Sequence, residues 1–62
     1  MKAFDATKEA ADLVNYYGSV KGAIAACVQY QETKFAQTFW KSPPGKGYRR
    51  KHDHTLAALR RM

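Results

Sequence analysis

Five cationic side chains lie within eleven residues in the second half of the chain, and aromatic residues are interleaved with them. The cations are Lys41, Lys46, Arg49, Arg50 and Lys51, and the aromatic residues are Trp40 and Tyr48. Arginine binds phosphate through two parallel hydrogen bonds, and a ring such as that of Tyr48 stacks on a base. The stretch 41–51 therefore predicts binding to a polyanion, with nucleic acid as the first candidate. An acidic host protein and a merely solubilising role are the alternatives.

The charge of the chain is concentrated in the same half. Residues 1–33 hold three lysines against four carboxylates, a net charge of −1, whereas residues 34–62 hold eight cations against one carboxylate, a net charge of +7. Arg60 and Arg61 complete the basic set near the C-terminus. This asymmetry is typical of proteins that bind phosphate groups.

The other residues with reactive or metal-binding side chains do not indicate catalysis or a metal site. His52 and His54 are the only histidines. Residues two apart do not share a helix face, and no second cluster completes a four-ligand metal site. Cys27 is the single cysteine, which excludes an intramolecular disulfide and fits a small core residue in a reducing compartment. We therefore expect no enzyme activity, no cofactor and no metal site.

The length of 62 residues allows one domain, residues 1–62. A chain of this size buries only about 60% of the surface that its unfolded form exposes, and oligomers often stabilise such domains. The charged N-terminal sequence does not resemble a signal peptide, and the longest uncharged run, Gly22 to Gln31, is far shorter than the ~20 apolar residues of a membrane span. We expect a soluble, cytoplasmic protein without membrane contact.

Helices are expected to position these residues, in an all-α fold of three or four short helices. Asp5 is suited to cap a first helix, and its apolar residues recur with helical spacing until Gly18 ends it. Ser19 is suited to cap the second helix. The expected core consists of Leu13, Val14, Tyr17, Val20, Ile24, Cys27, Val28, Phe35 and Phe39, closed by Leu56 and Leu59.

Two interpretations remain open for residues 20–40. No Gly or Pro occurs between Ala23 and Ser42, so one long helix from Val20 to Trp40 would keep a continuous apolar face. A break around residues 29–31 would instead give a third helix that begins near Glu32. Periodicity does not distinguish the two.

The stretch 41–51 is predicted to be a loop that becomes ordered on binding. Pro43 and Pro44 are helix breakers in helix interiors, and Gly45 and Gly47 add conformational freedom. We therefore expect residues 42–51 to be the longest non-helical stretch, and Gly18–Ser19 to be the tightest junction. Asp53 is then expected to cap a short C-terminal helix.

The segment Tyr17–Val28 reads YGSVKGAIAACV, in which a Gly and a small polar residue precede a helix with an Ala–Ala pair. Residues 13–40 resemble in this respect the helix-turn-helix of small Fis-like and phage-regulator DNA-binding modules, with Thr33 opening the recognition helix. The resemblance implies that a set of polar side chains faces the major groove: Gln29, Gln31, Glu32, Lys34 and Gln37. The chain departs from the pattern where Val28 or Gln29 replaces the usual turn Gly and Lys34 replaces an apolar residue. A helical hairpin is the alternative.

Eight aromatic residues are many for a chain of this length. On a long helix, Tyr30 and Trp40 would point away from the apolar face, so we expect them to contact another helix or another subunit, and we predict a homodimer with both residues as partner-binding.

The sequence as a whole favours a small basic DNA-binding regulator or accessory protein, of the kind that phages and prophages encode. The alternatives are an inhibitor or adaptor that binds a host protein through its aromatic and basic surface, and an RNA-binding accessory protein.

Overall fold

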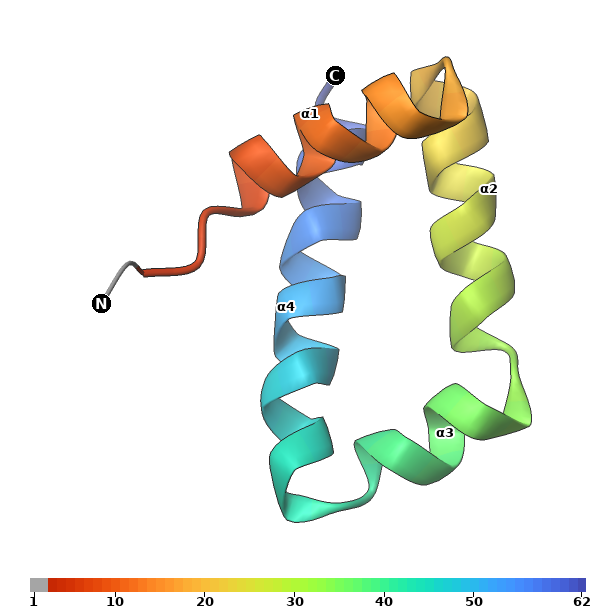
Figure 1. Cartoon of the computed structure of the whole chain (residues 1–62), viewed down its shortest axis with the longest axis vertical. Helices are drawn as coiled ribbons and strands as arrows, with labels where there is room; N and C mark the ends of the chain where they lie inside the picture. The colour runs from red at the N-terminus through yellow and green to blue at the C-terminus, as the bar shows by residue number, and fades with distance from the viewer. Residues whose placement is uncertain (1–2) are drawn as a thin grey trace.

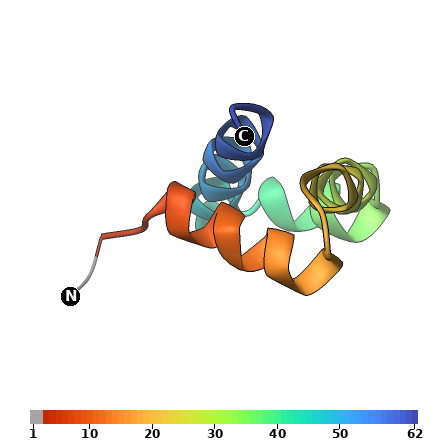
Figure 2. The same ribbon diagram turned by 90° about the horizontal axis from the view of Figure 1, so that it is seen from above.

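The computed structural model describes residues 3–62, and these residues form an all-α fold without a strand. The four helices are α1 (Ala6–Tyr17), α2 (Val20–Gln31), α3 (Lys34–Trp40) and α4 (Pro43–Arg60). In Figure 1, α2 and α4 run in opposite directions, and α1 and α3 cross between their ends, so that the helices form a four-sided frame. Seen from above in Figure 2, α1 lies on one side of both α2 and α4. The molecule is flat, with extents of 31 × 30 × 17 Å.

Each helix begins at a side chain that accepts hydrogen bonds from the backbone of its first turn. Asp5 accepts from the amides of residues 7 and 8, and Ser19 Oγ accepts from the amide of Gly22 at 2.9 Å. Gly18 ends α1 with a φ of 83°, in the left-handed region that favours glycine. The predicted cap positions at Asp5, Gly18 and Ser19 are therefore confirmed.

The chain between Val20 and Trp40 forms two helices, so of the two open interpretations the one with a break is correct. Thr33 interrupts the helix, because its Oγ1 accepts a hydrogen bond from the amide of Ala36 at 3.1 Å and donates one to the carbonyl of Tyr30 at 2.7 Å. A threonine side chain that bonds the neighbouring backbone in this way competes with the helical pattern. The break lies at Glu32–Thr33, slightly later than residues 29–31.

The stretch 41–51 is helical from Pro43 onward, so the predicted basic loop is wrong. Ser42 is the N-cap of α4, and its Oγ accepts the amide of Gly45 at 3.1 Å. Pro43 and Pro44 occupy the first helical positions, where a backbone N–H has no intrahelical partner, so proline costs nothing there. The predicted cap at Asp53 is also wrong, since this residue lies in mid-helix.

Three two-residue connections join the helices, namely 18–19, 32–33 and 41–42. Gly18–Ser19, expected to be the tightest junction, is therefore as short as the other two. In the connection from α3 to α4 the two backbones approach closely, because a Cβ on Gly45 would overlap the carbonyl oxygen of Phe39. Only glycine allows this contact.

The core lies where α1, α2 and α4 meet, and it is built mainly from small side chains. Its buried residues are Ala10, Ala23, Cys27, Leu56 and Leu59. Leu59 is the largest side chain that is fully buried. Four expected core residues pack partly buried against this cluster: Leu13, Val14, Ile24 and Val28. Ala36 is the buried residue of α3.

Two expected core residues are exposed. Phe35 is 70% exposed and Tyr17 is 47% exposed. The prediction for Phe35 is wrong because the break at Thr33 turns α3 away from the direction of α2, so the helical face that contains Ile24 and Val28 does not continue into α3. Tyr17 ends α1 and contacts the ring of Tyr16 edge-on. Phe39 is half-buried.

Candidate nucleic-acid interface

Most of the predicted phosphate-binding residues lie on one helix. Lys46, Tyr48, Arg49, Arg50, Lys51 and Arg60 belong to α4, Arg61 is its C-cap, and Lys41 is the C-cap of α3. Asp53 is the only carboxylate in α4. The basic residues are therefore fixed relative to one another by helical geometry, in contrast to the flexible loop that the sequence suggested.

One side of α4 lies opposite the residues that the helix buries. At 100° per residue, the buried residues Gly45, Thr55, Leu56 and Leu59 fall on one side of the helix, and a second set falls opposite to them. We call this set the outer face, and it consists of Lys46, Gly47, Arg50, His54, Ala57 and Arg61. None of these residues is acidic. The outer face thus presents three cations without a competing carboxylate.

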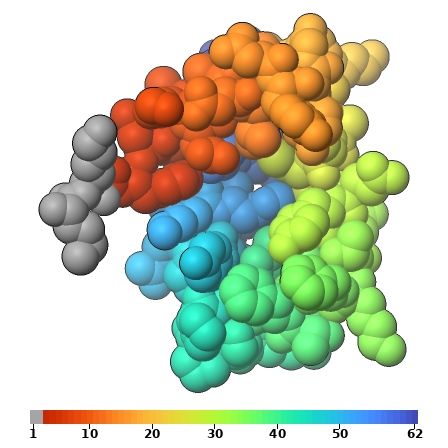
Figure 3. Space-filling view, viewed as in Figure 1, coloured from red at the N-terminus to blue at the C-terminus, as the bar shows by residue number. Residues whose placement is uncertain are grey.

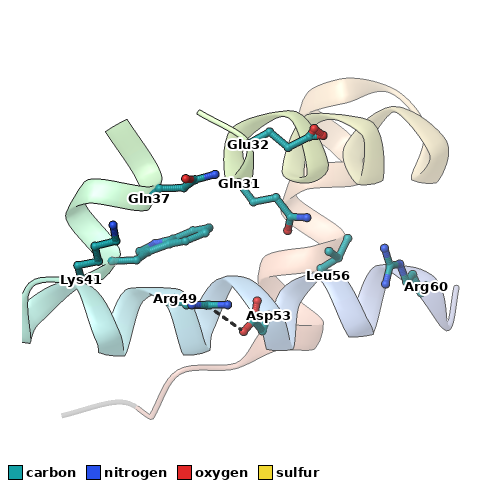
Figure 4. A pocket seen from close by; sticks show the side chains of 9 residues that line it. Gln31, Glu32, Gln37, Lys41, Arg49, Asp53, Leu56 and Arg60 are labelled. Atoms are coloured by element: carbon teal, nitrogen blue, oxygen red, sulfur yellow. Dashed lines mark ion pairs between the residues drawn. The ribbon is translucent and has the colours of Figure 1, made fainter. Parts of the chain in front are cut away.

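Two other cations of α4, Arg49 and Arg60, line a cleft between α4 and the junction of α2 with α3 (Figure 4). The cleft has a volume of about 660 Å³. Its lining residues are Gln31, Glu32, Gln37, Trp40, Lys41, Arg49, Asp53, Leu56 and Arg60. Its charges are mixed, because Glu32 and Asp53 offset two of its three cations. The cleft is therefore a weaker anion site than the outer face.

Arg49 lines this cleft. Its Nε lies 3.9 Å from Asp53 Oδ2, and its guanidinium carbon lies 5.9 Å from the centroid of the Trp40 ring. The ion pair is exposed and contributes little to stability. Both contacts lie on the cleft side of α4, so Arg49 does not belong to the outer face.

Tyr30 and Trp40 belong to an aromatic cluster within the chain. Their ring centroids are 5.9 Å apart, and the ring of His52 lies 5.0 Å from Trp40 and 6.1 Å from Tyr30. The cluster connects α2, α3 and α4. Of the two expectations for these residues, contact with another helix is thus met within the chain, while Tyr30 remains 41% exposed.

His52 is the titratable member of this cluster. Its Nε2 lies 3.1 Å from Oε1 of Gln31, at hydrogen-bond distance. Burial lowers the pKa of the His52 imidazole, and the carboxylate of Asp53 opposes this effect only in part. The neutral ring is therefore the favoured form in the folded chain.

The two residues predicted to read bases line different hollows. Gln31 ends α2 and is engaged with His52 in the cleft. Lys34 is exposed at the start of α3 and lines a hollow with Phe35, Thr38 and Phe39.

A row of aromatic side chains crosses from α3 to α4, and sequence reasoning missed it. Phe35 and Phe39 are nearly parallel, at 17° and 6.3 Å between centroids, and Tyr48 lies 5.3 Å from Phe39. The ammonium of Lys51 is 5.2 Å from the centroid of Tyr48 and 5.6 Å from that of Phe4. We call Phe35, Phe39, Tyr48 and Phe4 the aromatic row. Thr33, a good N-cap residue before Phe35, was the signal that separates this row from the core.

Cys27 belongs to the core and also lines a hollow with Phe4 and Tyr48. Burial raises the pKa of its thiol, and the negative charge of Glu9 raises it further. Both effects favour the neutral thiol.

No family model, no curated protein and no solved structure matches this chain. Within residues 3–62, no helix combines the length and apolar character needed to cross a membrane. The same residues contain no group of three or more side chains suited to hold a metal ion.

Proposed function

We propose that this chain is a small nucleic-acid-binding protein, a DNA-binding regulator or accessory protein that anchors phosphate groups on α4. The observation that carries the proposal is the outer face of α4, where Lys46, Arg50 and Arg61 are displayed on a rigid helix without a carboxylate among them. Cations fixed in this way bind the phosphate backbone of a nucleic acid and release its condensed counterions.

The small residues of the outer face support the same proposal. Gly47 and Ala57 lie between the cations, and a Cβ on Gly47 would meet no atom within 4 Å. The glycine is therefore not required for packing, although in an exposed helix it costs about 1 kcal/mol relative to alanine. Small side chains at these positions let a polyanion approach the helix backbone closely.

Two finer features belong to the proposal. Sequence recognition of the helix-turn-helix kind would depend on Lys34 and the exposed polar residues of α3, because Gln31 is engaged with His52. A homodimer is favoured by the small core and would present two copies of α4 to one duplex. Sedimentation velocity of the purified chain tests the dimer.

An adaptor that binds a host protein through Tyr30 and Trp40 has less support. These two rings contact each other and His52, and Trp40 is half-buried, so part of their apolar area is already used within the chain. We therefore place nucleic acid first.

The test is an anisotropy titration of a labelled DNA duplex at several salt concentrations. The slope of log K against log salt is about −0.9 per phosphate contact on duplex DNA. The double variant Lys46→Gln/Arg50→Gln should bind more weakly and flatten the slope by nearly two units, because it removes two contacts.

The matched control is Lys8→Gln/Lys21→Gln, which removes the same charge from α1 and α2. It should leave the slope unchanged if the outer face binds the duplex. Equal effects of the two double variants, or no binding by the parent at about 50 mM salt, would overturn the proposal.

A further inference from the structure

We propose that the aromatic row is a stacking platform for the bases of a single-stranded nucleic acid. This inference rests on the proposed function and deepens it, because it names the form of nucleic acid that the chain binds best. Base–aromatic stacking is tolerant of sequence and contributes strongly to the binding of single strands.

The rings of the row are accessible, and the core does not need them. Phe35 is 70% exposed and Tyr48 is 56% exposed. The core cluster of buried hydrophobic residues lies elsewhere, on α1, α2 and the second half of α4. Several large aromatic side chains left together on one surface mark a binding site more often than a structural role.

The geometry of the row suits a chain of bases. Phe35, Phe39 and Tyr48 follow one another with centroid spacings of 6.3 and 5.3 Å, and the first two rings have nearly the same orientation. Figure 3 shows that atoms of α3, in green, adjoin atoms of the first turns of α4, in teal and cyan. The rings thus come from two helices that meet, so their relative positions are fixed by the α3–α4 junction.

Cations stand at both ends of the row, as the phosphates of a bound strand require. Lys34 lines a hollow with Phe35 and Phe39 at one end. At the other end, Arg50 and Lys51 line a hollow with Phe4. Lys51 is exposed, so its ammonium can leave the rings of Tyr48 and Phe4 and bind a phosphate instead.

Carboxylates gather at the Phe4 end of the row. Phe4 lines one hollow with Asp5, Glu9 and Asp12, and Glu9 also lines a hollow with Phe4, Tyr48 and Lys51. Among the described residues, the linings of the hollow at Phe35 and Phe39 and of the hollow at Arg50 and Lys51 include no carboxylate. The part of the row from Phe35 to Tyr48 is therefore complementary to a polyanion.

The need for exposed base faces argues against a duplex as the occupant, and the charges argue against a second copy of the chain. The faces of bases are covered in a duplex, whereas unpaired bases can be splayed onto aromatic side chains. In a symmetric contact between two copies, each surface patch meets itself. The cations Lys34 and Lys51 of the two copies would then be brought into one interface, and among the described residues Glu9 is the one carboxylate that lines a hollow with either of them.

The experiment compares a labelled single-stranded oligonucleotide of mixed pyrimidines with a duplex of the same length. The variants are Phe35→Leu and Tyr48→Leu, which remove a ring and keep apolar bulk at an exposed position. We expect each to weaken single-strand binding about tenfold and to leave duplex binding nearly unchanged. The salt slope should not change, because no phosphate contact is removed.

Two controls separate stacking from other effects. Tyr16→Leu removes a ring that is 80% exposed on α1, outside the row, and it should leave single-strand binding unchanged. Tyr48→Phe keeps the ring and should retain parental affinity. Circular dichroism melts should show that all four variants fold like the parent.

The outcomes distinguish this inference from the proposed function. Duplex binding without stronger single-strand binding, or single-strand binding that Phe35→Leu does not weaken, would overturn the stacking platform and leave the proposed function standing. Absence of binding to both probes would overturn both. A parental dimer that Phe35→Leu dissociates without loss of oligonucleotide affinity would assign the row to self-association and overturn the platform.

Discussion

The two halves of α4 have different surroundings although they form one continuous helix. The second half buries Thr55, Leu56 and Leu59 in the domain, whereas every residue from Lys46 to Lys51 in the first half is exposed. The second half stabilises the fold, and the first half presents four exposed cations: Lys46, Arg49, Arg50 and Lys51. Because helix propagation adds a hydrogen bond for each residue fixed, a half that is anchored in a core can carry an exposed half that has no core of its own.

The exposed half is also anchored where it begins. Gly45 lies against the carbonyl of Phe39, and Ser42 bonds the backbone on both sides of the α3–α4 junction. The position of the basic residues of α4 therefore depends on two separate contacts, one in the core and one at the α3–α4 junction. Changes at each contact should therefore have different consequences.

The largest expected effect is on the core half. Leu59→Ala should lower the free energy of unfolding by about 2–5 kcal/mol, because it leaves a cavity at the largest fully buried side chain. In a domain this small, much of the population would unfold. Phe35→Ala, at an exposed position, should change stability far less. Urea denaturation of both variants checks the contrast, and equal losses would contradict it.

The next effect concerns the junction, where two glycines of the exposed half should respond with opposite signs. An alanine Cβ at Gly45 would overlap the carbonyl of Phe39, so Gly45→Ala should cost about 1–3 kcal/mol through overpacking. Gly47→Ala meets no atom and should stabilise the helix by about 0.5–1 kcal/mol. Thermal melts measure both.

Hydrogen exchange measures how Gly45→Ala affects each half of α4 separately. The amides of the first half of α4 should exchange faster in Gly45→Ala, while those of the second half stay protected. A uniform increase along α4 would show that the two halves do not behave as separate regions.

The smallest effect is the pH dependence of stability that arises from His52, which packs against Tyr30 and Trp40. The folded chain holds the pKa of His52 below its ordinary value, so below about pH 6.5 the unfolded chain binds a proton that the folded chain does not. Stability should therefore be complete above this pH and fall modestly as pH decreases toward the folded-state pKa. Melting temperatures at pH 8 and pH 5 measure the difference. The variant His52→Gln should lose this component, and an unchanged pH dependence in the variant would contradict the assignment.

The sequence predicted the first half of the chain well because its signals are local. Asp5, Gly18 and Ser19 act within one turn of themselves, and their hydrogen bonds depend on no distant residue. The break at Thr33 also had a local signal, but Phe35 and Phe39 continue the apolar period of α2. Periodicity therefore favoured one helix as much as two.

The beginning of α4 was misread for a related reason. Pro43 and Pro44 were interpreted by their effect in a helix interior, whereas Ser42 before them makes them the first positions of a helix. The requirement for Gly45 could not be inferred at all, since the carbonyl that it meets belongs to another helix. Composition identified the basic residues of the candidate site, but their common outer face and the aromatic row follow from helix boundaries that only the fold establishes.

Each helix of the frame has a very small residue at a buried position: Ala10, Ala23, Ala36 and Gly45. These four positions therefore tolerate the fewest substitutions, because any larger residue must push two helices apart. The exposed cations and rings are under no such restriction from the fold. A lineage of such proteins could exchange its ligand by changing surface residues alone, while the small residues at the helix crossings stayed the same.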